Sequence, residues 1–205
     1  MTAAVAARRR GIGDIRSVGV EGSAEHVAFM RQHLVDNDVS PEAHNIIHGV
    51  VGQKDGIAHF PLLFDASVEW GAEAKFEEER NSWQRFYERA SQCLPWTKQP
   101  MKPVRCISLA TLLADFDRVD IIHCDVQGAE ADVISAAMSE MATTVRRIVV
   151  GTHSRMIEHR LFETFLGSGW RLEMEAPCVF QLIDGRPHLL NDGEHVWANP
   201  RLDPG

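Results

Sequence analysis

Apolar residues along most of this chain alternate between short continuous runs and stretches with helical spacing, a pattern typical of strands alternating with helices. We predict strands over residues 15–20, 44–51, 57–63, 104–107, 119–124, 145–150, 170–175 and 178–183. We predict helices over 2–10, from 24 to near 37, near 76–92, after 108, over 129–141 and over 155–167. This order favours an α/β fold in which helices cover both faces of a mostly parallel sheet. The last two strands are expected to pair as an antiparallel edge.

The length of 205 residues is typical of one domain. We expect this domain to occupy residues 1–190. Residues 65–102 mix aromatic and charged side chains and end in several prolines, which indicates an insertion that forms a lid or substrate wall. Residues 191–205 are rich in Pro, Gly and Asn, and we expect a tail with little structure of its own.

Composition narrows the possible partners and the compartment. The formal net charge of -8 disfavours nucleic acid or an anionic membrane as the main partner. The four cysteines show no C-x-x-C spacing, a pattern that favours reduced thiols over a disulfide framework. No stretch has the 18 or so apolar residues of a membrane span. We therefore expect a soluble cytoplasmic protein.

The candidate functional residues directly follow predicted strands, where open α/β sheets bind their ligands. Glu21 is placed either to accept hydrogen bonds from ribose hydroxyls or to stabilise the start of the next helix. His123, Asp125 and Glu130 form the densest polar group at any strand end, although acids there also serve as helix caps. His153 ends the next strand, and it is either structural or, beside Asp125, a candidate base.

Several of these segments together resemble the FkbM-type methyltransferases. They are Gly19-Val20-Glu21-Gly22-Ser23, Gly49-Val50-Val51-Gly52 with Asp55-Gly56, the run from Val119 to Glu130 (VDIIHCDVQGAE), and Gly151-Thr152-His153-Ser154. The run from Val119 to Glu130 is the most specific. The resemblance extends from the first predicted helix to about Glu175.

The resemblance implies a Rossmann-like class I methyltransferase fold, a three-layer sandwich that uses S-adenosylmethionine to methylate a hydroxyl of a sugar or another small molecule. It implies no metal. Glu21, with Gly22 and Ser23, would hold the cofactor ribose, and Val51 and Gly52 would lie near the adenine. Asp125 and Gln127 would lie by the methionine end of the cofactor. Glu130 and His153 would line the acceptor side, with Asp125 or His153 as the base.

Two departures from the family pattern affect these expectations. The family commonly has Glu where this chain has Gln127, which puts a role based on charge at that position in doubt. The family's first strand and Gly-x-Gly loop should also precede the helix in which this chain begins. We therefore expect a domain without its first strand, and Gly11 and Gly13 lie too late to replace the loop.

Three other functions are compatible with parts of the pattern. The chain could be an inactive or split-gene fragment of such an enzyme. It could also be a metal-dependent hydrolase that uses His123, Asp125 and His153 as ligands, but Glu21-Gly22-Ser23 would then have no role. A nicotinamide-dependent enzyme would likewise place an acid after a strand, but the glycine fingerprint of that class does not occur in this chain.

Overall fold

The computed structural model describes residues 10–13, 15–62, 72–76 and 100–203. It contains two compact units, Met1–Val50 with Ile57–Arg105 and Val51–Gly56 with Cys106–Gly205. The predicted helices over 2–10 and near 76–92 lie wholly or mostly outside the described residues, as does most of the predicted insertion. In the described part of the chain, every helix is too short or too polar to cross a membrane.

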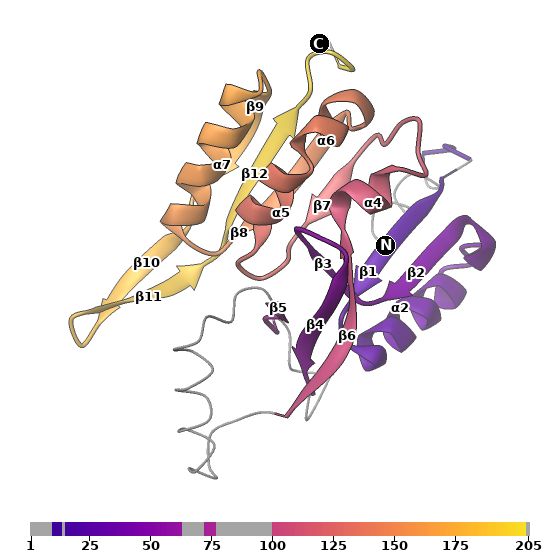
Figure 1. Ribbon diagram of the computed structural model, residues 1–205, viewed down its shortest axis with the longest axis horizontal. Coiled ribbons are helices and arrows are strands. Elements are labelled where there is room, and N and C mark those ends of the chain that lie inside the picture. The colour runs from indigo at the N-terminus through magenta and orange to yellow at the C-terminus, as the bar shows by residue number, and fades with distance from the viewer. Residues whose placement is uncertain (1–9, 14, 63–71, 77–99, 204–205) are drawn as a thin grey trace. The chain divides into compact units, whose positions relative to one another are not determined.

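The first unit contains a parallel pair of strands with one helix beside it. Strands β1 (Ser17–Glu21) and β2 (His44–His48) pair in parallel, with Glu21 opposite His48. Helix α2 (Ala24–Asp36) connects them and packs against β2 (Figure 1). As predicted, α2 begins after Ser23, whose hydroxyl accepts the His26 backbone N–H. A short 3-10 turn, Pro41–Ala43, precedes β2.

A separate four-stranded sheet has the order β3-β6-β4-β5. Its strands are β3 (Val50–Gly52), β4 (Gly56–Pro61), β5 (Lys75–Phe76) and β6 (Met101–Ser108). The predicted strand over 44–51 is therefore two strands, β2 and β3. The predicted strands on either side of residues 52–56 are not neighbours in the sheet, because β6 lies between β3 and β4.

The second unit contains a sheet of order β7-β8-β12-β9. Its strands are β7 (Ile122–Cys124), β8 (Arg147–Thr152), β9 (Arg171–Ala176) and β12 (Gly193–Ala198). Strands β7 and β8 run parallel, whereas β12 runs antiparallel to both β8 and β9. The predicted α/β class with an antiparallel C-terminal part is thus confirmed.

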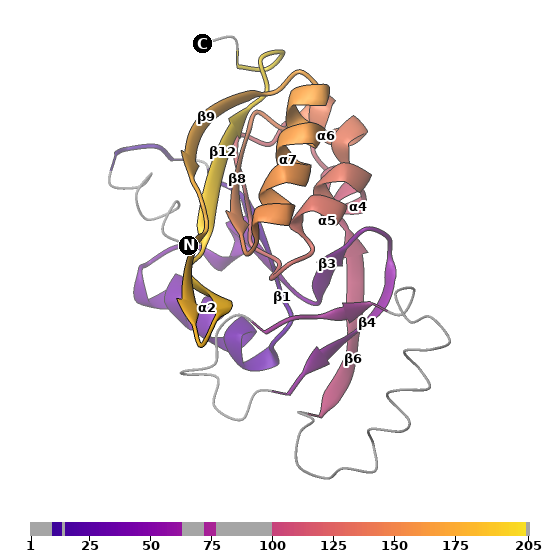
Figure 2. The ribbon, with the colours of Figure 1, turned by 90° about the vertical axis from the view of Figure 1, so that its left-hand side faces the viewer.

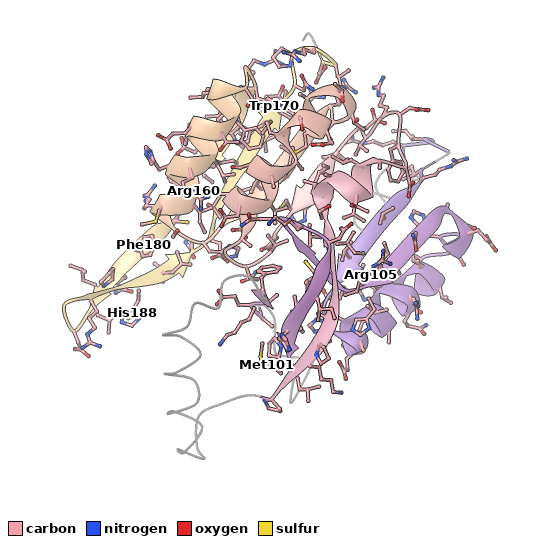
Figure 3. The ribbon with its side chains drawn as sticks, in the orientation of Figure 1. Met101, Arg105, Arg160, Trp170, Phe180 and His188 are labelled. Carbon is pink, nitrogen blue, oxygen red and sulfur yellow. The ribbon has the colours of Figure 1, made fainter. Side chains whose placement is uncertain are left out.

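Helices cover one face of this sheet, as the two views of the unit show (Figure 1, Figure 2). They are α4 (Leu109–Leu113), α5 (Glu130–Ala136), α6 (Met138–Thr144) and α7 (Arg155–Gly167). The single helix predicted over 129–141 is two helices, because the backbone leaves helical geometry at Ala137. An ion pair between Arg160 of α7 and Asp132 of α5 links two of these helices (Figure 3).

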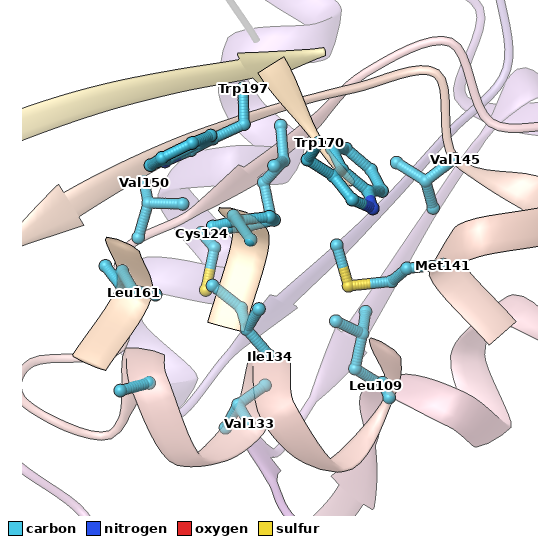
Figure 4. Packing of buried hydrophobic residues seen from close by; sticks show 14 of the residues in the cluster. Leu109, Cys124, Val133, Ile134, Met141, Val145, Val150, Leu161, Trp170 and Trp197 are labelled. Carbon is cyan, nitrogen blue, oxygen red and sulfur yellow. The ribbon is translucent and has the colours of Figure 1, made fainter. Parts of the chain in front are cut away.

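The core of the second unit lies between this sheet and its helices (Figure 4). Trp197 of β12 is fully buried and stacks on Phe165 of α7, with ring centroids 4.8 Å apart. Ile134 of α5 and Met141 of α6 lie below Trp197 in Figure 4 and are also fully buried. Buried apolar side chains of this size each contribute about 1.5–3 kcal/mol, so the cluster provides much of the stability of this unit.

The C-terminal part of the chain differs from its prediction in two ways. The expectation that residues 191–205 have little structure is wrong, because β12 occupies the interior of the sheet. The expected pairing of the last two predicted strands is also wrong. Strand β9 pairs with β12, while β10 (Val179–Ile183) forms an antiparallel hairpin with β11 (Arg186–Asn191). Phe180 and His188 lie on this exposed hairpin (Figure 3).

Candidate functional site

Asp125 and His153 meet because they follow two neighbouring parallel strands. Cys124 at the end of β7 lies opposite Val150 of β8, so the carboxyl ends of both strands share one edge of the sheet. Asp125 is the next residue after β7, and His153 is the next after β8. The Asp125 Oδ1 atom lies 3.3 Å from His153 Nε2. The side chain of Asp125 is 42% exposed and that of His153 is 16% exposed, so this pair is accessible mainly through the carboxylate.

Glu130 approaches the other nitrogen of the same imidazole ring. Its Oε1 atom lies 3.0 Å from His153 Nδ1. Glu130 is fully buried, at the first position of α5. The ring of His153 is therefore held between two carboxylates, one buried and one exposed.

The carboxylate of Glu130 also fixes the turn that carries the rest of the site. It accepts the backbone N–H of Val126 at 3.1 Å and that of Gly128 at 3.0 Å. The turn requires left-handed backbone geometry at Gln127, with φ +54°, and at Gly128, with φ +108°. Both amides precede α5, whose N-cap residue makes no side-chain hydrogen bond, so Glu130 holds the turn before the helix and in addition approaches His153.

The surroundings shift the pKa values of His153 and Glu130 in opposite directions. The Glu130 carboxylate raises the pKa of His153, burial opposes this effect, and Asp125 and Asp192 add to the increase. Burial alone would raise the pKa of Glu130, but His153 and the Gly128 N–H outweigh it and leave that pKa lowered. Both shifts favour the charged forms of these two side chains.

Two further residues position the exposed carboxylate. The Gln127 Nε2 amide donates to Asp125 Oδ1 at 2.9 Å, so an amide at this position attracts Asp125 where a glutamate would repel it. Gly151 provides space, because a Cβ there would lie 3.2 Å from Asp125 Cγ. No role at the site is predicted for Gly151 from the sequence. In a single sequence its only signal is a glycine at the end of a strand beside a polar cluster.

In the first unit, the residues after β1 form a compact turn. The Glu21 Oε1 atom accepts the Ser23 backbone N–H at 2.7 Å and lies 3.7 Å from His26 Nδ1. Glu21 Oε2 makes no hydrogen bond among the described residues. Ser23 is the buried cap of α2, and a Cβ at Gly22 would lie 2.6 Å from the ring of Phe60. This turn is therefore well ordered by its own contacts, and Glu21 retains one carboxylate oxygen for a ligand.

The predicted adenine residues lie on β3. Gly52 is buried, and Val51 is half-buried and packs against the core of the second unit. Asp55, three residues on, accepts the Ser108 N–H at 2.7 Å and the Thr111 hydroxyl at 2.8 Å. The Asp55-Gly56 part of the resemblance thus secures the start of α4, a role that the sequence analysis did not assign.

The polar group after β7 and β8 differs from the ligand set of the hydrolase alternative. The residues whose ligand atoms lie within 4.8 Å of one another are Asp125, Glu130 and His153. His123 is exposed on β7 and is not in this group. Both ring nitrogens of His153 face carboxylate oxygens of this group. The proposed ligand set of His123, Asp125 and His153 is therefore not the set that the structure brings together.

Comparisons with known proteins identify the family of the chain. Residues 99–182, which contain Asp125, Glu130 and His153, match the model of the methyltransferase FkbM domain. A protein of Jannaschia sp. (strain CCS1) named "Putative methyltransferase" is 30% identical over 198 residues, covering 97% of this chain and 67% of that protein.

Two solved structures are similar at low TM-scores. Precorrin 8W decarboxylase of Methanobacterium thermoautotrophicum has a TM-score of 0.43 at 9% identity, over 89% of this chain and 69% of that one. Magnesium protoporphyrin IX methyltransferase of Synechocystis PCC 6803 has a TM-score of 0.35 at 12% identity, over 96% and 76%. At these TM-scores and identities, neither structure bears on the function of this chain. The match to the domain model and the identity to the Jannaschia protein together show that the chain belongs to the FkbM methyltransferase family.

Proposed function

We propose that this chain transfers a methyl group from S-adenosylmethionine to a hydroxyl group of a sugar or another small molecule. The observation that carries the proposal is the contact of Asp125 with His153 at the shared ends of β7 and β8. It places an exposed carboxylate where open α/β sheets bind their ligands. S-adenosylmethionine would supply the methyl group on a sulfonium, from which a nucleophilic oxygen takes it directly.

The chain's own contribution to such a reaction is alignment of the acceptor and removal of its proton. Asp125 is the accessible member of the pair, and its Oδ2 atom makes no hydrogen bond among the described residues. His153 lies behind it at 3.3 Å. In the proposed reaction, the Asp125–His153 pair binds the acceptor hydroxyl and receives its proton.

Both units contain residues that we propose as cofactor ligands. In the first unit, Glu21 fits a ribose because one carboxylate oxygen is held by the Ser23 N–H and the other makes no hydrogen bond among the described residues. Gly22 and Ser23 support that geometry. In the second unit, we propose Val51 and Gly52 as adenine neighbours and Asp125 with Gln127 as ligands of the methionine end. A carboxylate suits this end, because the methionine amino group is cationic.

Calorimetric titration of the chain with S-adenosylmethionine tests the cofactor part of the proposal. We expect saturable one-to-one binding that Glu21→Gln weakens about tenfold or more, since a hydrogen bond to a charged group contributes about 1.5–3 kcal/mol. Glu163→Gln is the matched control, because Glu163 is an exposed α7 residue that contacts only His159 among the described residues. Absence of binding by the folded chain would contradict the proposal. Unchanged affinity in Glu21→Gln would remove the ribose role of Glu21.

Calorimetric titration of the chain with metal ions tests the hydrolase alternative. Zinc or manganese bound in a one-to-one ratio, and lost in His153→Gln, would favour it over methyl transfer. We expect no stoichiometric binding, because a metal binds deprotonated histidine whereas the carboxylates beside His153 favour its protonated form.

A further inference from the structure

The base of the proposed reaction can be assigned more narrowly from the contacts of His153. This assignment rests on the proposed function, and the geometry that supports it exists in the chain without cofactor or acceptor. Nδ1 of His153 faces a fully buried carboxylate at 3.0 Å, and Nε2 faces an exposed one at 3.3 Å. Nδ1 makes no aligned hydrogen bond among the described residues, so its contact with Glu130 is one of distance and charge. Carboxylates attract positive charge, so both contacts favour the protonated form of histidine, in which each ring nitrogen carries an N–H.

We propose that the buried carboxylate of Glu130 keeps His153 protonated and turned toward Asp125, so that His153 acts as a donor to Asp125 and the Oδ2 atom of Asp125 is the proton acceptor. Glu130 is then a positioning residue, which acts through His153. This replaces its expected place on the acceptor side, since a fully buried carboxylate cannot contact an acceptor directly.

The second set of Glu130 contacts strengthens this assignment. The same carboxylate holds the Val126 and Gly128 amides, so it fixes the turn in which Gln127 donates to Asp125 Oδ1. Asp125 Oδ1 therefore faces two donors, Gln127 Nε2 and His153 Nε2. Oδ2 remains available for a hydroxyl proton. In the proposed step, the acceptor O–H bond breaks and its proton moves to Oδ2. The oxygen forms its new bond to the methyl carbon while the S–CH3 bond of S-adenosylmethionine breaks, and the electron pair of that bond stays on sulfur, which leaves S-adenosylhomocysteine.

The charged groups around His153 all act in the same direction. Asp125 follows β7, Glu130 begins α5, and Asp192 lies between β11 and β12, and each of them raises the pKa of His153. Burial is the opposing effect. The raised pKa favours the imidazolium, in the same sense as the two short distances to carboxylate oxygens.

Nuclear magnetic resonance titration of the histidine side chains in the full chain, without cofactor or acceptor, tests this inference. We expect the His153 midpoint to lie above that of exposed His188. In Glu130→Gln the midpoint should move to lower pH, because burial remains and the closest negative charge is lost. Asp125→Asn should move it in the same direction but less, because Asp125 is farther away and exposed to water.

Glu163→Gln is again the matched control, and it should leave the His153 midpoint unchanged. A wild-type His153 midpoint at or below that of His188 would overturn the inference, and this measurement remains available if Glu130→Gln does not fold. A midpoint that Glu130→Gln does not move would overturn it as well. Because no cofactor is needed, failure here is distinguishable from failure to bind S-adenosylmethionine.

A second readout uses the reaction itself. If Asp125 accepts the proton, Asp125→Asn abolishes methyl transfer, whereas His153→Gln retains a measurable rate because a glutamine amide still donates to Oδ1. Loss of all transfer in His153→Gln with full transfer in Asp125→Asn would instead make His153 the base.

Discussion

Gly151 and Asp125 lie side by side at the end of the sheet, and the lack of a side chain on one makes room for the other. A Cβ at residue 151 would lie 3.2 Å from Asp125 Cγ and 3.4 Å from its Cβ. Since Asp125 is 42% exposed, it can move toward water to relieve this crowding. Such a movement would separate it from His153.

Gly151→Ala should therefore reduce methyl transfer much more than stability. We expect a loss on the order of tenfold or more, because small displacements of a catalytic group are costly in rate. Initial rates and chemical denaturation of the same preparation would check this. A variant with full activity would show that the Asp125 position does not depend on the space at Gly151.

Gln127→Glu tests the amide that holds Asp125. It replaces a donor 2.9 Å from Asp125 Oδ1 with a second carboxylate, so attraction becomes repulsion. We expect methyl transfer to fall on the order of tenfold, corresponding to about 1.5 kcal/mol for a hydrogen bond to a charged group. Gln127→Met, which has similar length and no charge, should lose less. Equal rates in both variants would mean that charge at this position is unimportant.

The opposite pKa shifts of His153 and Glu130 predict a pH window for the stability of their pair. The raised pKa of His153 adds stability below its ordinary value of 6.5, and this is lost as the pH rises through the folded-state value. The lowered pKa of Glu130 adds stability above 4.5, and this is lost as the pH falls through its folded-state value. The free energy of unfolding lost in His153→Gln should thus be larger at about pH 6 than at about pH 9. A loss independent of pH would show that the imidazolium contributes nothing.

His195 predicts the opposite pH dependence in the core of the second unit. It is fully buried on β12 with neither ring nitrogen hydrogen-bonded within the described chain, and burial lowers its pKa. Its titration therefore has no effect on stability well above its ordinary value of 6.5 and lowers the stability as the pH falls below that value. His195→Leu should raise the free energy of unfolding by about 1–2 kcal/mol, and by more in acid, since it removes unsatisfied polar atoms. His188→Gln on the exposed hairpin is the control. Destabilisation of His195→Leu at acidic pH would contradict this account.

Local signals predicted the elements well where a polar cap marks the boundary. The helices predicted from residue 24 and after residue 108 begin where Ser23 and Ser108 cap α2 and α4, and Gly169 follows the end of α7 with φ +77°. Pairing between distant strands was not predictable in this way. Residues 193–198 (GEHVWA) show no alternation of polar and apolar side chains, and only their pairing with β8 and β9 and the packing of Trp197 on Phe165 make them an interior strand. The Asp184-Gly185 turn, with both φ values positive, was a usable hairpin signal.

The meeting of Asp125 and His153 was predictable because parallel strands bring their carboxyl ends to one edge. The burial of Glu130 was not predictable, since it depends on how α5 packs against α7 and β8. His123 has the same strand phase as Asp125 in the sequence, yet it is exposed and lies outside the cluster. Alternation along a strand assigns a face but cannot say which face the helices cover.

The central claim is methyl transfer that depends on Asp125, and it is tested most directly with S-adenosylmethionine whose methyl group carries deuterium. Mass spectrometry of a panel of sugars and other small hydroxyl compounds would detect the labelled product. We predict a product that gains one labelled methyl group with the wild-type chain and with Asp120→Asn, a matched change at an exposed residue of the same segment. Asp125→Asn should form none while remaining folded. Labelled product formed equally by Asp125→Asn, or by no variant of the folded chain including the wild type, would contradict the account.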